Sequence, residues 1–443
     1  MIEAGPYVKH VFEGEVTDIL KSRCSGWLSF AIHTAIAWSK LDVALNYDSD
    51  WFVLKGINVK DKSQQTGPCL LIPFLSELDK NEKIKKAYKF VSILGWFKGG
   101  VVDIEGYMSG SHPIVYGGRP ILGITTEFGE KSFNCNYMPI IPDEKTRKAL
   151  AYWREGMKLQ YLHDGYSFLS FYKVIESQFT KGKGKGNWIT AAIPKLSEKA
   201  KERVDELTEQ GVDVSNHIFK SGCCAVAHAT EGEDNIDPDS VEDKLRLYKD
   251  KDMIVALARK YIEEELGVPT AIGLLEHRNS IEPLVDYISS EHVEILSLGG
   301  SILKKKLALN GVGVSISVWP DEPFEGFESL TLKVIRACDG IVQVKACAKS
   351  SMASLMFYFD FIKQKVHTSI EESGAVSVED GGSGQLEIAY LRYFCAVICN
   401  GTIELRLSNG GILTCEVVIP VNIDIGGSVK AAEARIDNLA AYL

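Results

Sequence analysis

The spacing of apolar residues changes twice along the chain, and these changes divide it into three stretches. In the first, short β-rich runs at 51–59 and 100–104 flank residues 78–96, where apolar side chains recur at helical spacing opposite charged ones. This combination of strand-like and helix-like patterns predicts an N-terminal mixed α/β domain over residues 1–142.

The second stretch, residues 143–288, has the apolar spacing of helices. Two prolines stop the preceding structure at 139 and 142, and Asp143 can cap the helix that follows. Further helices are predicted at 197–210, at 214–230, from Asp237-Pro238 and at 253–266. The residues that indicate the first two helices are Leu150, Trp153, Met157 and Tyr161, then Phe168, Phe171, Ile175 and Phe179.

The third stretch, residues 289–443, is β-rich. Residues 402–419 alternate between apolar and polar around Asn409-Gly410, which is a strong hairpin signal. We expect helices at 351–366 and 429–443, and a core strand that holds Cys395 and Cys399. The three stretches together predict an α+β, multidomain protein with an N-terminal α/β region, a central helical bundle and a C-terminal β-rich domain.

Composition and charge limit the kinds of binding partner that we expect. A chain of 443 residues with a net charge of −10 does not coat nucleic acid through broad basic surfaces, although a local basic patch is still allowed. Its ten cysteines are scattered, several within apolar runs, as in a cytoplasmic protein with reduced thiols. No signal peptide and no apolar run of about 20 residues is present, so we expect no membrane partner.

One stretch carries chemistry, the run Ser221-Gly-Cys-Cys-Ala-Val-Ala-His-Ala. The sequence has no phosphate-binding loop, zinc helix, nucleophile elbow or paired C-x-x-C motif. Cys224 and His228, four residues apart on a predicted helix, could bind a metal or form a nucleophile and base. No second ligand pair is evident, so no metal and no cofactor is predicted. Alternatively, His228 is a buried histidine that hydrogen-bonds a backbone carbonyl.

Several segments around this run resemble the methylamine-utilisation MauJ-like family. They are Tyr166-Ser-Phe-Leu-Ser-Phe-Tyr-Lys-Val-Ile-Glu, Trp188-Ile-Thr-Ala-Ala-Ile-Pro, the run from Ser221, Ile236-Asp-Pro-Asp-Ser-Val-Glu-Asp-Lys-Leu-Arg-Leu and Ala256-Leu-Ala-Arg-Lys-Tyr-Ile-Glu-Glu-Glu-Leu-Gly-Val-Pro. The resemblance covers about residues 145–270 well, the preceding 140 loosely and the C-terminal region not at all. The family's helical part is similar to the HEPN class of small helical bundles.

The resemblance implies a metal-independent ribonuclease lineage, found in antiviral, stress and RNA-processing systems. Such proteins carry an R-x4-6-H motif, and two copies meet to form one site. Histidine supplies a proton acceptor near neutral pH, and arginine stabilises the charged phosphorane. His228 matches the motif's histidine, but Cys223 stands at the arginine position. Lys220 lies about 12 Å of helical rise from His228, and it could approach the other copy's His228.

A second candidate feature is Phe179-Thr-Lys-Gly-Lys-Gly-Lys-Gly-Asn, between two predicted helices. Lys181, Lys183 and Lys185 alternate with glycines and could form a mobile loop that binds RNA phosphates. The same residues could equally be a solvated linker between helices.

The sequence therefore favours a HEPN-like protein that binds RNA, or cleaves it if the altered motif is active. Catalytic candidates are His228 and Lys220, and RNA-binding candidates are the three lysines. The alternative is a non-catalytic scaffold or regulatory protein that acts through oligomeric or protein–protein assembly. Expected partners are RNA, a second copy of the chain and a protein partner. An enzyme whose site lies in the C-terminal domain is a third option, which no motif marks.

Overall fold

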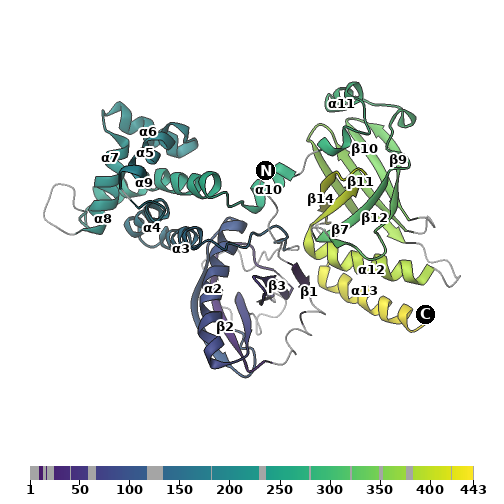
Figure 1. Cartoon of the computed structure of the whole chain (residues 1–443), viewed down its shortest axis with the longest axis horizontal. Helices are drawn as coiled ribbons and strands as arrows, with labels where there is room; N and C mark the ends of the chain where they lie inside the picture. Colours follow the sequence, from purple (N-terminus) through teal and green to yellow (C-terminus); the bar gives the residue numbers. More distant parts are fainter. Residues whose placement is uncertain are drawn as a thin grey trace.

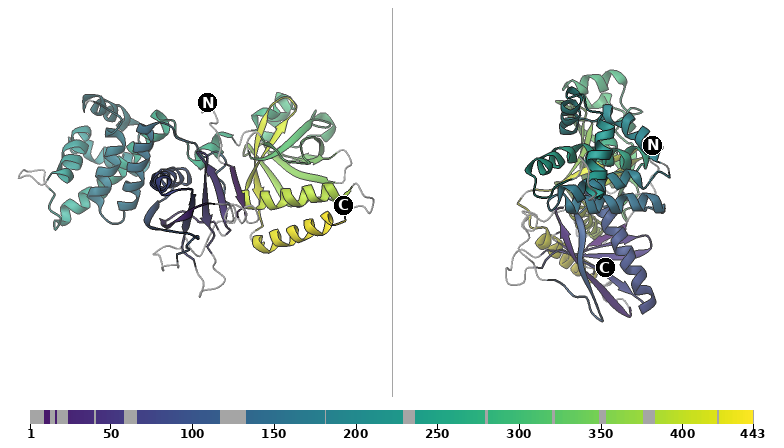
Figure 2. Two further views of the ribbon diagram at one scale, coloured as in Figure 1. Left: turned by 60° about the horizontal axis from the view of Figure 1, so that its bottom comes forward. Right: turned by 90° about the vertical axis from the view of Figure 1, so that its left-hand side faces the viewer.

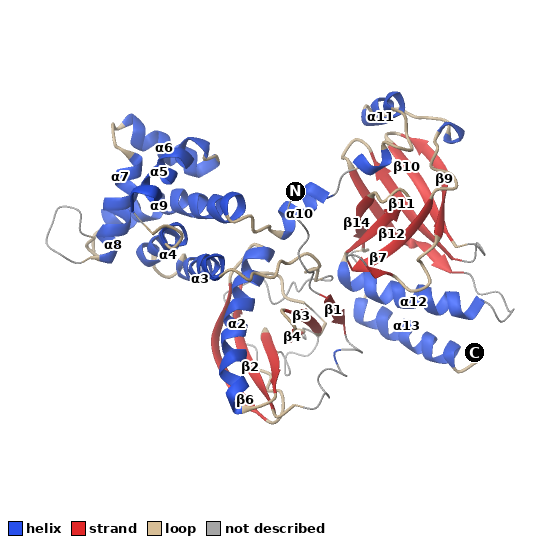
Figure 3. Ribbon diagram, in the orientation of Figure 1, coloured by secondary structure: helices blue, strands red, loops and turns tan. Residues whose placement is uncertain are grey.

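Three modules lie in a row, with the N-terminal module between the other two (Figure 1; Figure 2, left). The structure is a computed structural model of the chain. The α+β, multidomain fold is confirmed, with a sheet-and-helix module, a helical module and a β-rich module (Figure 3). The structure describes residues 9–12, 16, 24–39, 41–57, 66–116, 133–180, 182–228, 236–278, 281–319, 322–348, 353–375, 383–420 and 422–442.

The N-terminal module is a six-stranded antiparallel sheet with one long helix on a face. The strand order is β1-β3-β4-β5-β2-β6. Helix α2 (Glu77–Lys98) is the helix predicted at 78–96; Ser76 caps its start and Gly99, at φ 73°, ends it. Phe90 of α2 stacks on Phe52 of the sheet with ring centroids 4.2 Å apart. The strands are β1 (Lys9–Phe12), β2 (Gly26–Thr34), β3 (Val43–Tyr47), β4 (Asp50–Lys55), β5 (Cys69–Phe74) and β6 (Val102–Gly110).

The helical module begins where the sequence predicts it. The side chain of Asp143 accepts a hydrogen bond from the Thr146 N–H and so caps α3. The predicted start at Asp237-Pro238 is wrong by three residues, because Ser240 caps the helix there and Val241 is its first residue. The elements are α3 (Glu144–Leu159), α4 (Asp164–Glu176), α5 (Gly182–Ala192), η2 (Ile193–Lys195), α6 (Glu198–Glu209), α7 (Val214–His217), η3 (Ile218–Cys224), α8 (Ala225–Ala227), α9 (Val241–Lys260), η4 (Tyr261–Glu265) and α10 (Ala271–Arg278).

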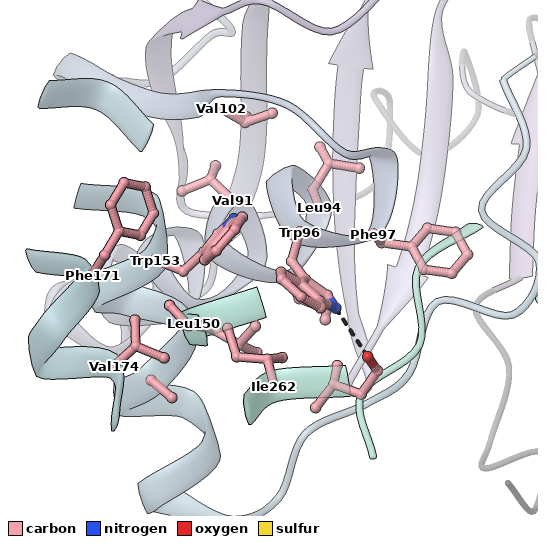
Figure 4. Packing of buried hydrophobic residues seen from close by; sticks show 14 of the residues in the cluster. Val91, Leu94, Trp96, Phe97, Val102, Leu150, Trp153, Phe171, Val174 and Ile262 are labelled. Atoms are coloured by element: carbon pink, nitrogen blue, oxygen red, sulfur yellow. Dashed lines mark hydrogen bonds between the residues drawn. The ribbon is translucent and has the colours of Figure 1, made fainter. Parts of the chain in front are cut away.

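The first two modules share one hydrophobic core. Trp96 of α2 packs edge-on against Trp153 of α3, and Trp153 packs against Phe171 of α4, both at 5.0 Å between ring centroids (Figure 4). The Trp96 indole N–H also donates to the Val268 carbonyl at 3.2 Å. Aromatic pairs of this geometry add to the gain from burial. Helix α2 therefore belongs to both modules and fixes one against the other.

The C-terminal module is a sheet closed on itself. Its order is β13-β14-β12-β11-β10-β9-β7-β8, and β13 also pairs with β7. The predicted hairpin is confirmed as β13 and β14, with Gly410 at φ 90° in the turn. The elements are η5 (Glu282–Leu284), α11 (Ser290–Ser297), η6 (Lys304–Lys306), β7 (Gly313–Trp319), β8 (Glu322–Pro323), β9 (Leu330–Cys338), β10 (Ile341–Cys347), β11 (Ala353–Asp360), β12 (Lys365–Ala375), α12 (Ser383–Asn400), β13 (Thr402–Leu407), β14 (Ile412–Val418) and α13 (Ile425–Ala440).

Two predictions in this module are wrong. The helix expected at 351–366 is the strand β11 followed by the start of β12, and the strand expected around Cys395 is helix α12. Both runs are apolar on more than one face, so the spacing of their apolar residues indicates neither a helix nor a strand. In β11, for example, Met356 is buried along with Leu355 and Phe357.

A short segment joins the N-terminal module to the closed sheet. Asn136 donates a side-chain N–H to the Val318 carbonyl of β7 at 2.9 Å, and Asn134 hydrogen-bonds Thr402 of β13. Beside them, burial raises the pKa of the Glu404 carboxyl. Within the described part of the chain, no helix is long and apolar enough to cross a bilayer.

Candidate functional site

The chemically suggestive run begins in a π-helix: residues 221–224 belong to η3, residues 225–227 form the short helix α8, and Ala229 lies outside the described residues. Residues 218–224 form η3, whose backbone hydrogen bonds span five residues and widen the turn. The α-helical stripe expected for Lys220, Cys224 and His228 is therefore not maintained. The π-helix packs tightly against α4. A Cβ on Gly222 would lie 2.3 Å from Cζ of Phe168 on α4.

The predicted catalytic residues do not converge within one chain. His228 follows the end of α8 with an exposed side chain, so the interpretation as a buried histidine is wrong. Its backbone N–H donates to the Cys224 carbonyl at 3.0 Å, and no described side chain orients its imidazole. Lys220 is exposed, whereas Cys223 is only 8% exposed and burial raises the pKa of its thiol to about 12. The buried thiol belongs to the core.

The glycine–lysine stretch is helical where it is described. Residues 182–192 form α5, so the predicted loop is wrong there, and Lys181 lies outside the described residues. Lys183 is exposed. Lys185 is 8% exposed, with Nζ at 2.5 Å from Glu176 Oε1 and 4.5 Å from the centre of the Tyr172 ring. Burial alone would lower the pKa of Lys185, but its bonds to Glu176 and Tyr172 outweigh this and raise it.

The most buried charged residue of the helical module was not predicted from the sequence. Asp250 of α9 is 1% exposed. Its Oδ1 accepts from Arg203 of α6 at 2.8 Å, and its Oδ2 contacts Nε2 of His217, at the end of α7, at 2.7 Å. Arg246, one turn before Asp250, donates to the Ser221 carbonyl in η3. These contacts join α6, α7, η3 and α9 at one point.

Both guanidinium groups of this cluster are bound within the protein. The other guanidinium nitrogen of Arg203 pairs with Glu206 at 2.8 Å, and Arg246 also contacts Asp243 at 3.4 Å. A histidine held by an aspartate is the arrangement of a general base. Here, however, both guanidinium groups are hydrogen-bonded to carboxylates and to a backbone carbonyl, so the cluster stabilises the packing of the helices. The signal that could have found it is Asp250 itself, a carboxylate at the helical spacing of the buried Leu247 and Ile254.

The cleft between α6 and α9 does not favour a charged ligand. It encloses about 420 Å³ beside the start of α6. Four basic and four acidic side chains line it, so it presents no net charge. They are Lys195, Lys199, Arg259 and Lys260, and Glu198, Asp252, Glu263 and Glu264.

The outward surface of α9 is apolar where a solvated face would be polar. Val241, Leu245 and Tyr248 follow one another at helical spacing and are 62%, 57% and 61% exposed. Tyr161 and Leu162, in the turn after α3, are 82% and 73% exposed. We call these five residues the outer apolar patch.

Lys251 connects the two parts of the outer apolar patch. Its Nζ lies 5.1 Å from the centre of the Tyr248 ring, 3.0 Å from the Gln160 carbonyl and 2.5 Å from Asp164 Oδ1. Tyr248 therefore lies next to the turn that holds Tyr161 and Leu162. The sequence feature that could have predicted the outer apolar patch is a second apolar stripe on α9, in addition to the stripe that faces the core.

Replacing Asp250 by alanine should lower the free energy of unfolding by about 3–5 kcal/mol, because Arg203 and His217 would stay largely buried without the carboxylate that lies between them. Urea denaturation followed by circular dichroism measures the change. Asp205→Ala is the matched control, since the Asp205 side chain is 52% exposed and pairs with Lys201, which predicts a loss below about 1 kcal/mol. Equal losses in the two variants would contradict the role of Asp250.

Cys223 should resist thiol reagents in the folded protein, because its thiol is buried and stays protonated at pH 8 when its pKa is about 12. Denaturation should make it react at once. Peptide mass spectrometry after brief alkylation measures both states, with the half-buried Cys338 as the internal reference. If native Cys223 is labelled as fast as Cys338, its side chain is not part of the core.

Comparison with known proteins covers only the helical module. Residues 149–263, from within α3 to within η4, match the family described as methylamine utilization protein MauJ. No curated protein and no solved structure matches the chain. The expected resemblance over residues 145–270 is thus confirmed, and the helical module is similar to the MauJ family, while the remainder of the chain lies outside the match.

Proposed function

We propose that this protein is a non-catalytic, homodimeric scaffold in which the helical module pairs two copies of the chain. The observation that supports this function is the outer apolar patch. Exposed apolar surface of this extent marks an interaction site in an otherwise ordinary protein. The outer apolar patch contains two tyrosines, a residue type that is enriched in protein interfaces, together with three aliphatic side chains.

The size of the outer apolar patch suits a dimer. Its five side chains expose on the order of 600 Å², taking about 150–200 Å² for each fully exposed side chain. Two copies face to face would bury about 1,200 Å², which reaches the lower end of the ~1,200–2,000 Å² of stable interfaces. The turn and helix that carry the patch are both held by Lys251, so the surface is formed before association.

The order of residues on α9 suits a two-fold axis. If two α9 helices pair antiparallel across Leu245, that residue meets its own copy and Val241 meets Tyr248 of the second copy. Glu242 and Lys249, both exposed on one flank of α9, then face each other between copies with opposite charge. One surface therefore complements itself, as a closed dimer needs.

The ribonuclease interpretation has less support from the same geometry. The resemblance implies two copies meeting, which the dimer satisfies. It also implies an arginine beside the histidine, but Cys223 is buried and the exposed His228 has no described partner to orient it. Proton transfer needs a positioned base and the phosphorane needs a cation. We therefore place assembly ahead of RNA cleavage.

Leu245→Asp should convert the dimer into a monomer, because the two-fold axis puts two new carboxylates face to face. We expect dimerisation to weaken by about 4 kcal/mol, taking ~2 kcal/mol for an interface hot spot in each copy. Sedimentation velocity at micromolar concentrations measures the change. Leu78→Asp is the matched control, since Leu78 on α2 is 92% exposed and outside the patch. A monomeric wild-type protein, or equal behaviour of both variants, would sink the proposal.

Incubation with structured RNAs should give no fragments ending in a 2′,3′-cyclic phosphate. Cys223→Arg should not create such activity, because residue 223 faces the core and a guanidinium there would not reach an RNA. Gel analysis of end-labelled RNA measures cleavage, with His228→Ala as the control for contaminating nucleases. Metal-independent cleavage by the wild-type protein that disappears in His228→Ala would restore the ribonuclease assignment.

A further inference from the structure

We infer that one end of the closed C-terminal sheet binds the surface of a membrane rich in anionic lipid. This inference is independent of the proposed dimer, since it concerns another module. The surface consists of three exposed aliphatic side chains and four lysines around them, and we call it the basic apolar rim. Its members are Leu298, Leu303, Ile362, Lys304, Lys305, Lys306 and Lys363.

Three segments meet at the rim. α11 lies at the end of the closed sheet opposite α12 and α13 (Figure 1). The turn after it lies beside the β9–β10 turn, since the Gly340 N–H donates to the Gly300 carbonyl at 3.0 Å. Ile362, in the β11–β12 turn, lies so close that a Cβ on Gly340 would be 2.7 Å from its Cγ1. The Ile302 N–H donates to the Ala337 carbonyl at 3.0 Å, which places Leu303 and η6 at the same end.

The aliphatic side chains are held in exposed positions. Leu298, Leu303 and Ile362 are 83%, 62% and 56% exposed. Asp360 Oδ1 accepts from the Ile362 and Lys363 N–H groups at 3.0 and 2.9 Å, so the turn that carries Ile362 is fixed. Three exposed aliphatic side chains close together at one end of the closed sheet mark a surface that would gain from burial in an apolar environment.

The lysines around these aliphatic side chains favour binding to an anionic surface. Lys304, Lys305, Lys306 and Lys363 are exposed, and none of their ammonium groups forms an ion pair with a described residue. The neighbouring acidic groups are Asp339 on the β9–β10 turn, Glu291 and Glu294 on α11, and Asp360 at the end of β11. Asp360 is 7% exposed and is bound by backbone N–H groups, so the four exposed lysines outnumber the three exposed carboxylates. This cationic excess is local, because the whole chain carries a net charge of −10.

A lipid surface satisfies both features at once. Anionic headgroups attract lysines near the surface, and aliphatic side chains on the same loops reach the boundary between headgroups and acyl chains. A nucleic acid would pair with the lysines but would leave the leucines against polar phosphate and sugar. The contact is peripheral, so it departs from the sequence-based expectation of no membrane partner without requiring a spanning helix.

The test is sedimentation of the full chain with vesicles of phosphatidylcholine alone and with vesicles containing one third phosphatidylserine. We expect binding to the second kind only, and weaker binding as NaCl rises from about 0.1 to 0.5 M. Replacing Lys304, Lys305 and Lys306 by alanine should weaken binding about 100-fold, at about fivefold for each lysine. Leu298→Ser with Leu303→Ser should also weaken it while leaving the charge unchanged.

The control replaces Lys195, Lys199 and Lys244 by alanine, since these lysines are equally exposed on the helical module and change the net charge identically. Circular dichroism checks that each variant is folded. Equal loss in the control and the rim variant would overturn the inference, as would equal binding to both kinds of vesicle. Absence of vesicle binding, or rim-dependent binding to a single-stranded RNA probe instead, would also overturn it.

Discussion

The contact between Asp250 and its two cationic partners determines which surface the helical module offers. A carboxylate that is 1% exposed needs strong partners, and Arg203 and His217 provide them from two other helices. Because Asp250 faces inward, the opposite side of α9 faces solvent, and that side holds Leu245 and Tyr248. The buried charge and the exposed apolar stripe are thus two consequences of one helix orientation.

The shared aromatic core extends this constraint to the N-terminal module. Trp153 contacts Trp96 on one side and Phe171 on the other, so α2, α3 and α4 cannot shift independently. A surface carried by α9 is therefore rigidly placed relative to the N-terminal sheet. This suits a scaffold, because a docking surface is most useful when its position relative to the rest of the chain is fixed.

Local patterns in the sequence were enough to predict much of the fold. Asp143, the periodicity of 78–96 and Asn409-Gly410 each act within a few residues, and all three predictions are confirmed. The features that were predicted wrongly or missed depend on contacts between residues far apart in the sequence. The strands predicted as a helix at 351–366 bury residues on both faces, and the contact of Arg203 with Asp250 joins residues 47 positions apart. The π-turn at 218–224 depends on packing against Phe168, which no local pattern reveals.

A buried lysine lies close to the Cys223 thiol. Burial is the main cause of the raised pKa of the Cys223 thiol; the Glu176 carboxylate raises this pKa further, and the Lys185 ammonium lowers it. Lys185 is bound to Glu176 and lies against the Tyr172 ring, so its charge is turned into the module. An arginine at 223 would have to compete with Lys185 for the same carboxylate. The positive charge of Lys185 therefore stabilises the core of the helical module and is not available to a phosphate.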